Sequence, residues 1–133
     1  MVGILYILMN FLDKQGLWKY YIQYFYFTCY MSFVKHIEGS FKEGKREEAI
    51  KKIVDFYNGL SGKIDGFNGF IMSGSLDDPQ KAVNISLWET REDMDDYYSN
   101  NKEYPSFLES LKPLIEQVTD NKDYRVFGFN INK

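Results

Sequence analysis

The sequence has little cysteine, histidine or basic charge, and each scarcity excludes a class of function. The single cysteine, Cys29, excludes an intrachain disulfide framework and is typical of a protein in the reducing cytoplasm. The single histidine, His36, excludes a metal site built from several histidines, so we expect no metal centre. A net charge of -3 argues against the basic surface that binds nucleic-acid phosphates. We therefore predict a cytoplasmic protein with no nucleic-acid partner.

Long apolar runs are also absent, although residues 1–30 are rich in aromatic side chains. The apolar stretches 1–12 and 17–30 are separated by a polar segment at 13–16. Each stretch is shorter than the ~20 residues that a helix needs to cross a bilayer. A secretory signal would begin with basic residues and end at a small-residue cleavage site, and neither feature is present. We expect no membrane partner.

Residues 1–30 differ from the rest of the chain, and two interpretations remain open. Met31 begins a sequence that reads as a complete domain, and the residues before it are types that AT-rich codons encode. We expect residues 1–30 to be an aromatic-rich extension outside the native protein, as translation from upstream of the true start would produce. The alternative is a peripheral hydrophobic extension. Residues 31–133 form the one predicted domain.

Hydrophobic periodicity predicts the elements of that domain. Alternation every second residue indicates strands, and apolar residues every three or four positions indicate amphipathic helices. The predicted order is a strand at 32–39, a helix at 42–62, strands at 66–76 and 82–90, helical segments at 91–101 and 104–119, and a strand at 123–132. This β-α-β-β-α-β order predicts an α+β, ferredoxin-like fold with a four-stranded antiparallel sheet and helices on one face.

The strand at 82–90 has two very different faces. Its sequence is AVNISLWET, which places Val83, Ile85 and Leu87 on one face and Asn84, Ser86 and Trp88 on the other. The preceding predicted strand, at 66–76, is apolar on both faces, because the adjacent residues Phe70 and Ile71 point to opposite faces. Helices cover only one face of such a sheet, so the other apolar face needs a second layer. We predict a homodimer that forms by sheet-to-sheet packing.

The segment 66–115 resembles the antibiotic biosynthesis monooxygenase (ABM) family of dimeric α/β barrels. The matching features are Gly66-Phe67 at the start of a strand, an aspartate-rich turn at 77–78, Trp88 followed by an acidic residue, paired tyrosines at 97–98, and the sequence LKPL at 111–114. The resemblance extends over roughly residues 32–131. It implies that two chains form a dimeric α/β barrel, and that a small-molecule cleft without a cofactor lies between each sheet and its own helices.

The resemblance also implies a reaction and a set of site residues. Cofactor-independent monooxygenases of this family oxidise flat phenols to quinones with dioxygen, and they need hydrogen-bond donors aimed at a developing oxyanion. Asn84 and Trp88 match the asparagine and tryptophan of that subgroup, whereas Met94 stands where the family has a tyrosine. An arginine of the later helix is also missing, with Leu108 near its position. The catalytic candidates are Asn84, Trp88 and Tyr98; the candidate contacts of a small aromatic substrate are Ser86, Met94, Tyr97, Phe70 and Met72.

Two other functions remain open at this stage. A non-catalytic small-molecule-binding or stress-related dimer would keep the fold and the cleft, and the departure at Met94 favours it. A haem-binding or haem-degrading protein would pair Trp88 with an axial ligand at the position of Tyr98. That branch also needs an asparagine on the first strand, where this sequence has His36 or Ile37.

Overall fold

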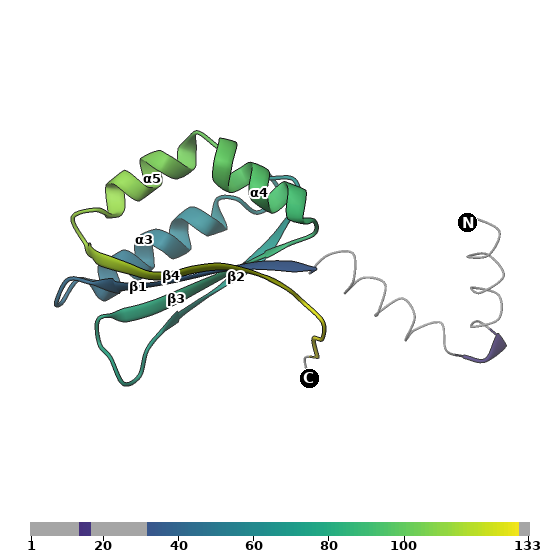
Figure 1. Ribbon diagram of the computed structural model, residues 1–133, viewed down its shortest axis with the longest axis horizontal. Helices are drawn as coiled ribbons and strands as arrows, with labels where there is room; N and C mark the ends of the chain where they lie inside the picture. The colour runs from purple at the N-terminus through teal and green to yellow at the C-terminus, as the bar shows by residue number, and fades with distance from the viewer. Residues whose placement is uncertain (1–13, 17–31, 131–133) are drawn as a thin grey trace.

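The computed structural model describes residues 14–16 and 32–130 of the chain, so most of the predicted 1–30 extension lies outside the described residues. The described domain runs in the order β1 (Phe33–Phe41), α3 (Arg46–Asn58), β2 (Phe67–Gly74), β3 (Lys81–Trp88), α4 (Arg91–Asn100), α5 (Glu103–Leu111) and β4 (Ile115–Arg125) (Figure 1). None of the described helices has both the length and the apolar character needed to cross a bilayer.

The four strands form one antiparallel sheet in the order β2-β3-β1-β4. Helices α3, α4 and α5 all lie over the same face of this sheet (Figure 1). The architecture is the ferredoxin-like α+β fold that the sequence predicted, with the second helical region divided into two helices. None of the helices in the described residues lies on the other face of the sheet.

Helix α3 docks on the sheet through one apolar stripe. Ala49, Ile53 and Tyr57 are spaced four residues apart and are buried, because that spacing brings them to the same side of a helix. Arg46, at the start of α3, donates hydrogen bonds to the carbonyl oxygens of Ser75 (2.8 Å) and Asp78 (3.0 Å). These bonds tie the hairpin between β2 and β3 to the helix.

Helix α4 begins at a side-chain cap and is held close to β2. The Thr90 hydroxyl accepts a hydrogen bond from the backbone N–H of Asp93 at 3.0 Å, which caps the first turn of the helix. Gly66 has a φ of +76°, and a Cβ at this position would collide with the Asp93 side chain. The Gly66-Phe67 pair therefore allows α4 to pack against the start of β2.

The final strand differs from its prediction. β4 starts at Ile115 and ends at Arg125, whereas the sequence predicted a helix to 119 and a strand at 123–132. Helix α5 ends at Leu111 because Pro113 has no N–H with which to continue the helical hydrogen bonds. The apolar spacing of 111, 114, 115 and 118 fits a helix equally well, so periodicity alone gave the wrong element there.

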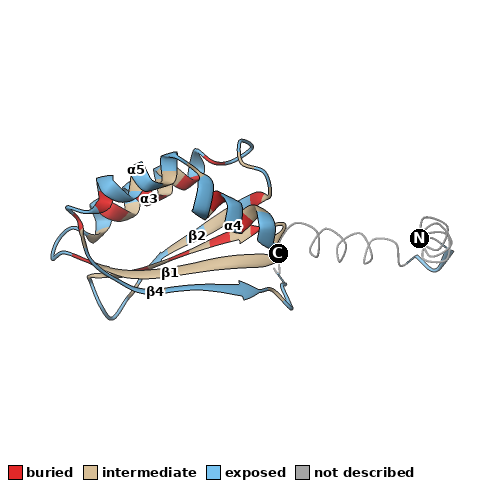
Figure 2. Ribbon diagram, turned by 45° about the horizontal axis from the view of Figure 1, so that its top comes forward, coloured by how far each residue is buried: buried red, intermediate tan, exposed pale blue. Residues whose placement is uncertain are grey.

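The two faces of β3 are arranged as the alternation predicted. Asn84, Ser86 and Trp88 are buried beneath the helices, together with Ala82, and the intervening residues are only partly buried on the helix-free face. Figure 2 shows the buried positions between the helices and the sheet, whereas β4 is exposed along most of its length. A site under the helices is therefore built on the Asn84 face of β3.

Candidate functional site

A chain of side-chain hydrogen bonds connects β3 to two helices. The Trp88 indole Nε1 donates to the Ser86 hydroxyl at 2.9 Å, and that hydroxyl lies 2.8 Å from the Tyr98 hydroxyl of α4. The Tyr98 hydroxyl lies 2.9 Å from the Tyr57 hydroxyl of α3. We call Trp88, Ser86, Tyr98 and Tyr57 the hydroxyl chain. It brings Ser86, Trp88 and Tyr98, all predicted site residues, into direct contact.

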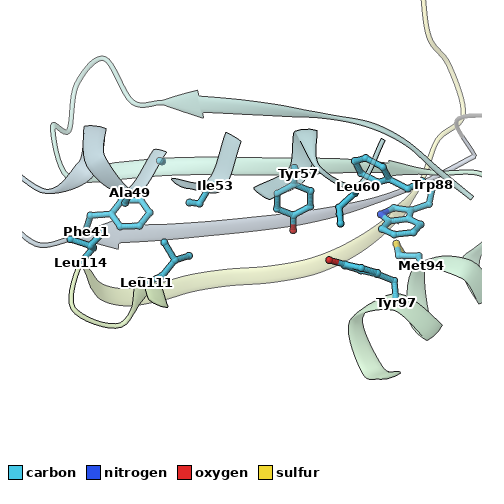
Figure 3. Close-up of a cluster of buried hydrophobic side chains, with 12 residues drawn as sticks. Phe41, Ala49, Ile53, Tyr57, Leu60, Trp88, Met94, Tyr97, Leu111 and Leu114 are labelled. Carbon is cyan, nitrogen blue, oxygen red and sulfur yellow. The ribbon is translucent and has the colours of Figure 1, made fainter. Parts of the chain in front are cut away.

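The space around Trp88 is filled by protein side chains. Trp88 is 0% exposed, and its ring centroid lies 5.3 Å from that of Tyr97 and 5.8 Å from that of Tyr98. Met94 is also fully buried, and Figure 3 shows Met94 and Tyr97 lying against the indole. The predicted contacts Met94 and Tyr97 therefore pack on Trp88, and they occupy the place where a ligand would meet the indole.

A cavity lies farther along the sheet, beneath α3 and α5. Its volume is about 70 Å³, which holds more than a single water molecule but is below the ~150 Å³ of a cavity that binds benzene, so an aromatic ligand would fill it and extend beyond it. The residues that line it from the sheet include Ile37, Gly39, Met72, Ala82 and Asn84, and those from the helices include Ile53, Tyr57, Tyr104, Phe107 and Leu111. Of the predicted site residues, Asn84 and Met72 line this cavity. Phe70 is paired with Ser86 across the strands and lies on the Trp88 side.

Asn84 is the polar group at the base of the cavity. Its side chain is buried, with the residue only 5% exposed, and no described residue hydrogen-bonds to its Oδ1 atom. A buried acceptor without a partner destabilises a protein by about 1–3 kcal/mol. The cavity therefore combines nearly apolar walls with the side-chain amide of Asn84, a lining that suits an apolar ligand with a hydroxyl group.

The cavity reaches the surface between α5 and β4. Leu108 of α5 and Val118 of β4 both line it, and they are 40% and 53% exposed. Exposed apolar side chains on both sides of an opening favour the entry of an apolar molecule. Gln117 of β4 adds a polar group to the lining near this mouth.

Four tyrosines around the site are held in their neutral form. Burial raises the pKa of Tyr57 and of Tyr98, and the neighbouring phenol groups raise that of Tyr57 further. Burial likewise raises the pKa of Tyr97 and of Tyr104. These hydroxyls can donate or accept hydrogen bonds, but none of them is a phenolate base at neutral pH.

The residues around Tyr98 do not fit an axial haem ligand. Its hydroxyl already interacts with Ser86 and with Tyr57, so coordination of iron would break the hydroxyl chain. His36 lies on the opposite face of the sheet, where it pairs with Ile85 across the strands and its Nδ1 is 3.5 Å from Asp120. Within the described part of the chain, no group of three or more His, Cys, Asp or Glu side chains is placed to hold a metal ion.

Sequence reasoning missed three residues of the site. Tyr57, Tyr104 and Phe107 were not among the candidate site residues. Phe107 stacks on Phe56 of α3 with ring centroids 3.9 Å apart, which holds α5 over the cavity. One available signal was Tyr57 itself, because a tyrosine at a buried helical position needs a partner for its hydroxyl.

Comparisons with solved structures support the fold. No family model and no curated protein matches the chain. A protein from Deinococcus radiodurans that is assigned as an antibiotic biosynthesis monooxygenase has 20% identity and a TM-score of 0.58, over 76% of this chain and 97% of that one. One from Nitrosomonas europaea with the same assignment has 21% identity and a TM-score of 0.58, over 74% and 90% of the chains.

A third protein with this assignment, from Chloroflexus aurantiacus J-10-fl, has 14% identity and a TM-score of 0.60, over 74% of this chain and 95% of that one. The described domain thus has the fold of proteins assigned as antibiotic biosynthesis monooxygenases, and the resemblance seen in the sequence is confirmed at the level of the fold. Identities this low do not extend to the reaction.

Removal of the Ser86 hydroxyl should destabilise the domain. In Ser86→Ala, the Trp88 N–H loses its acceptor and the Tyr98 hydroxyl loses one of its two partners. We expect the free energy of unfolding to fall by about 1–3 kcal/mol, measured by urea denaturation. Ser73→Ala, at an exposed position of β2, is the matched control. Equal effects of the two substitutions would contradict the role of the hydroxyl chain.

The raised tyrosine pKa values predict a loss of stability at high pH. The unfolded chain releases the Tyr57 proton near pH 10, whereas the folded chain retains it, so the contribution is fully present below pH 10 and is lost as the pH rises. Tyr57→Phe should flatten the decline in unfolding free energy above pH 10 by up to about 1.4 kcal/mol per pH unit. Ser99→Ala, which removes no tyrosine, should keep the wild-type slope. A wild-type slope in Tyr57→Phe would contradict the assignment.

Proposed function

We propose that this protein binds a small aromatic hydroxyl compound in the cavity beneath α3 and α5. The observation that carries this proposal is the buried side-chain amide of Asn84 in the lining of a nearly apolar cavity. Ligand pockets typically combine apolar walls with a few polar groups that fix the orientation of the ligand. The rings of Tyr104 and Phe107 supply flat walls on the helix side, and Asn84 supplies the polar contact on the sheet side.

The second candidate function is oxidation of that compound by dioxygen without a cofactor. Three proteins that share this fold are assigned as antibiotic biosynthesis monooxygenases, which favours this candidate. In the balanced reaction a phenol with a free para position and one dioxygen molecule give a para-quinone and one water molecule. The phenol supplies all the electrons, one oxygen atom enters the ring, and the other leaves as water.

The local geometry supports binding more strongly than turnover. The Trp88 N–H, which the family resemblance assigned to an oxyanion, donates to Ser86, and Trp88 does not line the cavity. No carboxylate and no histidine lines the cavity, and burial keeps the surrounding tyrosines protonated. A catalytic site here would therefore have only the amides of Asn84 and Gln117 and neutral tyrosine hydroxyls with which to orient the phenol.

We also propose that two copies of the chain form a dimer through their helix-free sheet faces. The strand registers place Ile71 opposite Ile85, and Leu87 opposite Val34, on this face. Val34 in turn faces Tyr124 of β4. Ile71 and Tyr124 are exposed in the single chain, and burial of such a patch favours association. The occupant that fits is a second copy, because a two-fold axis matches this surface with itself.

Ligand binding can be tested with two substitutions of the same kind. Leu108→Trp places an indole at the mouth of the cavity, whereas Leu76→Trp places one at the fully exposed hairpin between β2 and β3. Calorimetric titration with a panel of single-ring phenols should show binding to the wild type and to Leu76→Trp. In Leu108→Trp the Kd should rise at least about tenfold, equivalent to about 1.4 kcal/mol.

An oxygen electrode run with the same compounds separates the two candidate functions. Oxygen consumption with formation of a quinone, lost in Asn84→Leu, would identify the monooxygenase. Binding without oxygen consumption would identify the non-catalytic protein. If no compound binds to the wild type, or if Leu108→Trp binds as tightly as Leu76→Trp, the cavity is not the ligand site.

The dimer is tested by sedimentation velocity. Ile71→Asp places a charge among the apolar side chains of β2 and β3 on this face and should convert the dimer into monomers, because an unpaired carboxylate is costly to bury. Ser99→Asp adds the same group on the exposed side of α4 and should leave the dimer intact. A wild-type protein that sediments as a monomer at micromolar concentration would contradict the proposed assembly.

A further inference from the structure

We propose that Tyr57 donates a hydrogen bond into the cavity, so that the cavity binds aromatic compounds through an acceptor oxygen such as a carbonyl. This inference rests on the proposed function and deepens it, because it names the group that meets the ligand from the helix side. It extends the class of ligand from phenols to aromatic ketones.

The first observation is the number of protons in the hydroxyl chain. Ser86, Tyr98 and Tyr57 each carry one hydroxyl proton. Two contacts join them, from Ser86 to Tyr98 at 2.8 Å and from Tyr98 to Tyr57 at 2.9 Å. The Trp88 N–H can only donate, so it uses a lone pair of Ser86 and accepts no proton. Two contacts use two of the three hydroxyl protons, and one proton is left without a partner inside the chain.

The second observation is where that remaining proton can find an acceptor. Ser86 is 0% exposed and does not line the cavity, and its partners in the described part of the chain are Trp88 and Tyr98. Tyr98 does not line the cavity either, and its hydroxyl contacts the other two. Tyr57 is the member that lines the cavity. Because a buried donor without an acceptor destabilises a protein, the remaining proton is favoured at Tyr57.

The direction of the hydroxyl chain follows from this placement. Ser86 donates to Tyr98, and Tyr98 donates to Tyr57, which leaves the Tyr57 proton for the cavity. Figure 3 shows the Tyr57 hydroxyl directed away from α3, into the interior of the domain. Burial raises the pKa of Tyr57, so its oxygen keeps the proton at neutral pH. The reverse direction would leave the proton of the fully buried Ser86 without an acceptor.

The complement of this donor is a ligand oxygen with a free lone pair. A carbonyl oxygen accepts hydrogen bonds, and an aromatic ketone is otherwise apolar, as the lining of the cavity requires. The oxygen of a phenol can accept the same bond, so the ligand of the proposed function also fits. A hydrocarbon of the same shape would bury the Tyr57 proton without an acceptor.

The first test compares acetophenone with α-methylstyrene, in which a CH₂ group replaces the carbonyl oxygen. Calorimetric titration gives the ratio of the two Kd values, which cancels any change in packing that affects both compounds. Tyr57→Phe should weaken the binding of acetophenone relative to that of the alkene by about 2- to 10-fold. Tyr124→Phe removes a hydroxyl group from the helix-free face of the sheet and should keep the wild-type ratio, so it is the matched control.

The second test is the infrared carbonyl stretch of bound acetophenone. In the wild type it should lie at lower frequency than in a hydrocarbon solvent, because a hydrogen bond weakens the carbonyl bond. Tyr57→Phe should remove this shift, whereas Tyr124→Phe should keep it. The measurement on the wild type needs no variant, so it tests the inference even if Tyr57→Phe does not fold.

The outcomes separate this inference from the proposed function. A bound carbonyl without the shift, or a shift that persists in Tyr57→Phe, would overturn the inference and leave the cavity as a ligand site. A shift lost in Tyr104→Phe instead would identify the other tyrosine of the lining as the donor and would also overturn it. Binding of phenols without binding of acetophenone overturns the inference alone. If phenols, acetophenone and the alkene all fail to bind, the proposed function fails with it.

Discussion

The Ser86 hydroxyl is the contact on which the arrangement of the site depends. It accepts the Trp88 N–H from its own strand and meets the Tyr98 hydroxyl from α4, and Tyr98 extends the connection to Tyr57 of α3. All of these groups are mostly buried, and buried polar groups are stable only when they are paired. Pairing through one oxygen therefore fixes where two helices lie over β3.

That constraint determines which part of the cleft is open. Trp88, Met94 and Tyr97 pack into a solid layer at one end of the sheet–helix interface. The remaining space lies at the Asn84 end, beneath aromatic side chains of α3 and α5. Ser86 and Trp88, which hold the helices, thus lie on the same strand face as Asn84, which lines the cavity.

Much of this arrangement was predictable because it depends on local patterns. The alternation of residues 82–90 separated the two faces of β3, the family resemblance implied the cleft between the sheet and its helices, and helical periodicity identified α3. The start of β4 was not predictable from periodicity, since Ile115 and Val118 suit a helix and a strand alike. The packing around Trp88 depends on the orientation of two adjacent tyrosines. Both contact the indole ring, and Tyr98 also contacts the Ser86 hydroxyl through its own hydroxyl. That outcome is set by tertiary packing, which a single sequence does not encode locally.

The placement of the ligand is tested most directly by isotope-edited NMR of the protein with a bound phenol. Nuclear Overhauser contacts between the ligand ring and the side chains of Asn84 and Phe107, with none to the Trp88 indole, are the predicted result. Contacts to the Trp88 indole, together with displaced resonances of Met94 and Tyr97, would contradict it. They would show that the packed end of the cleft opens and that the ligand binds against Trp88.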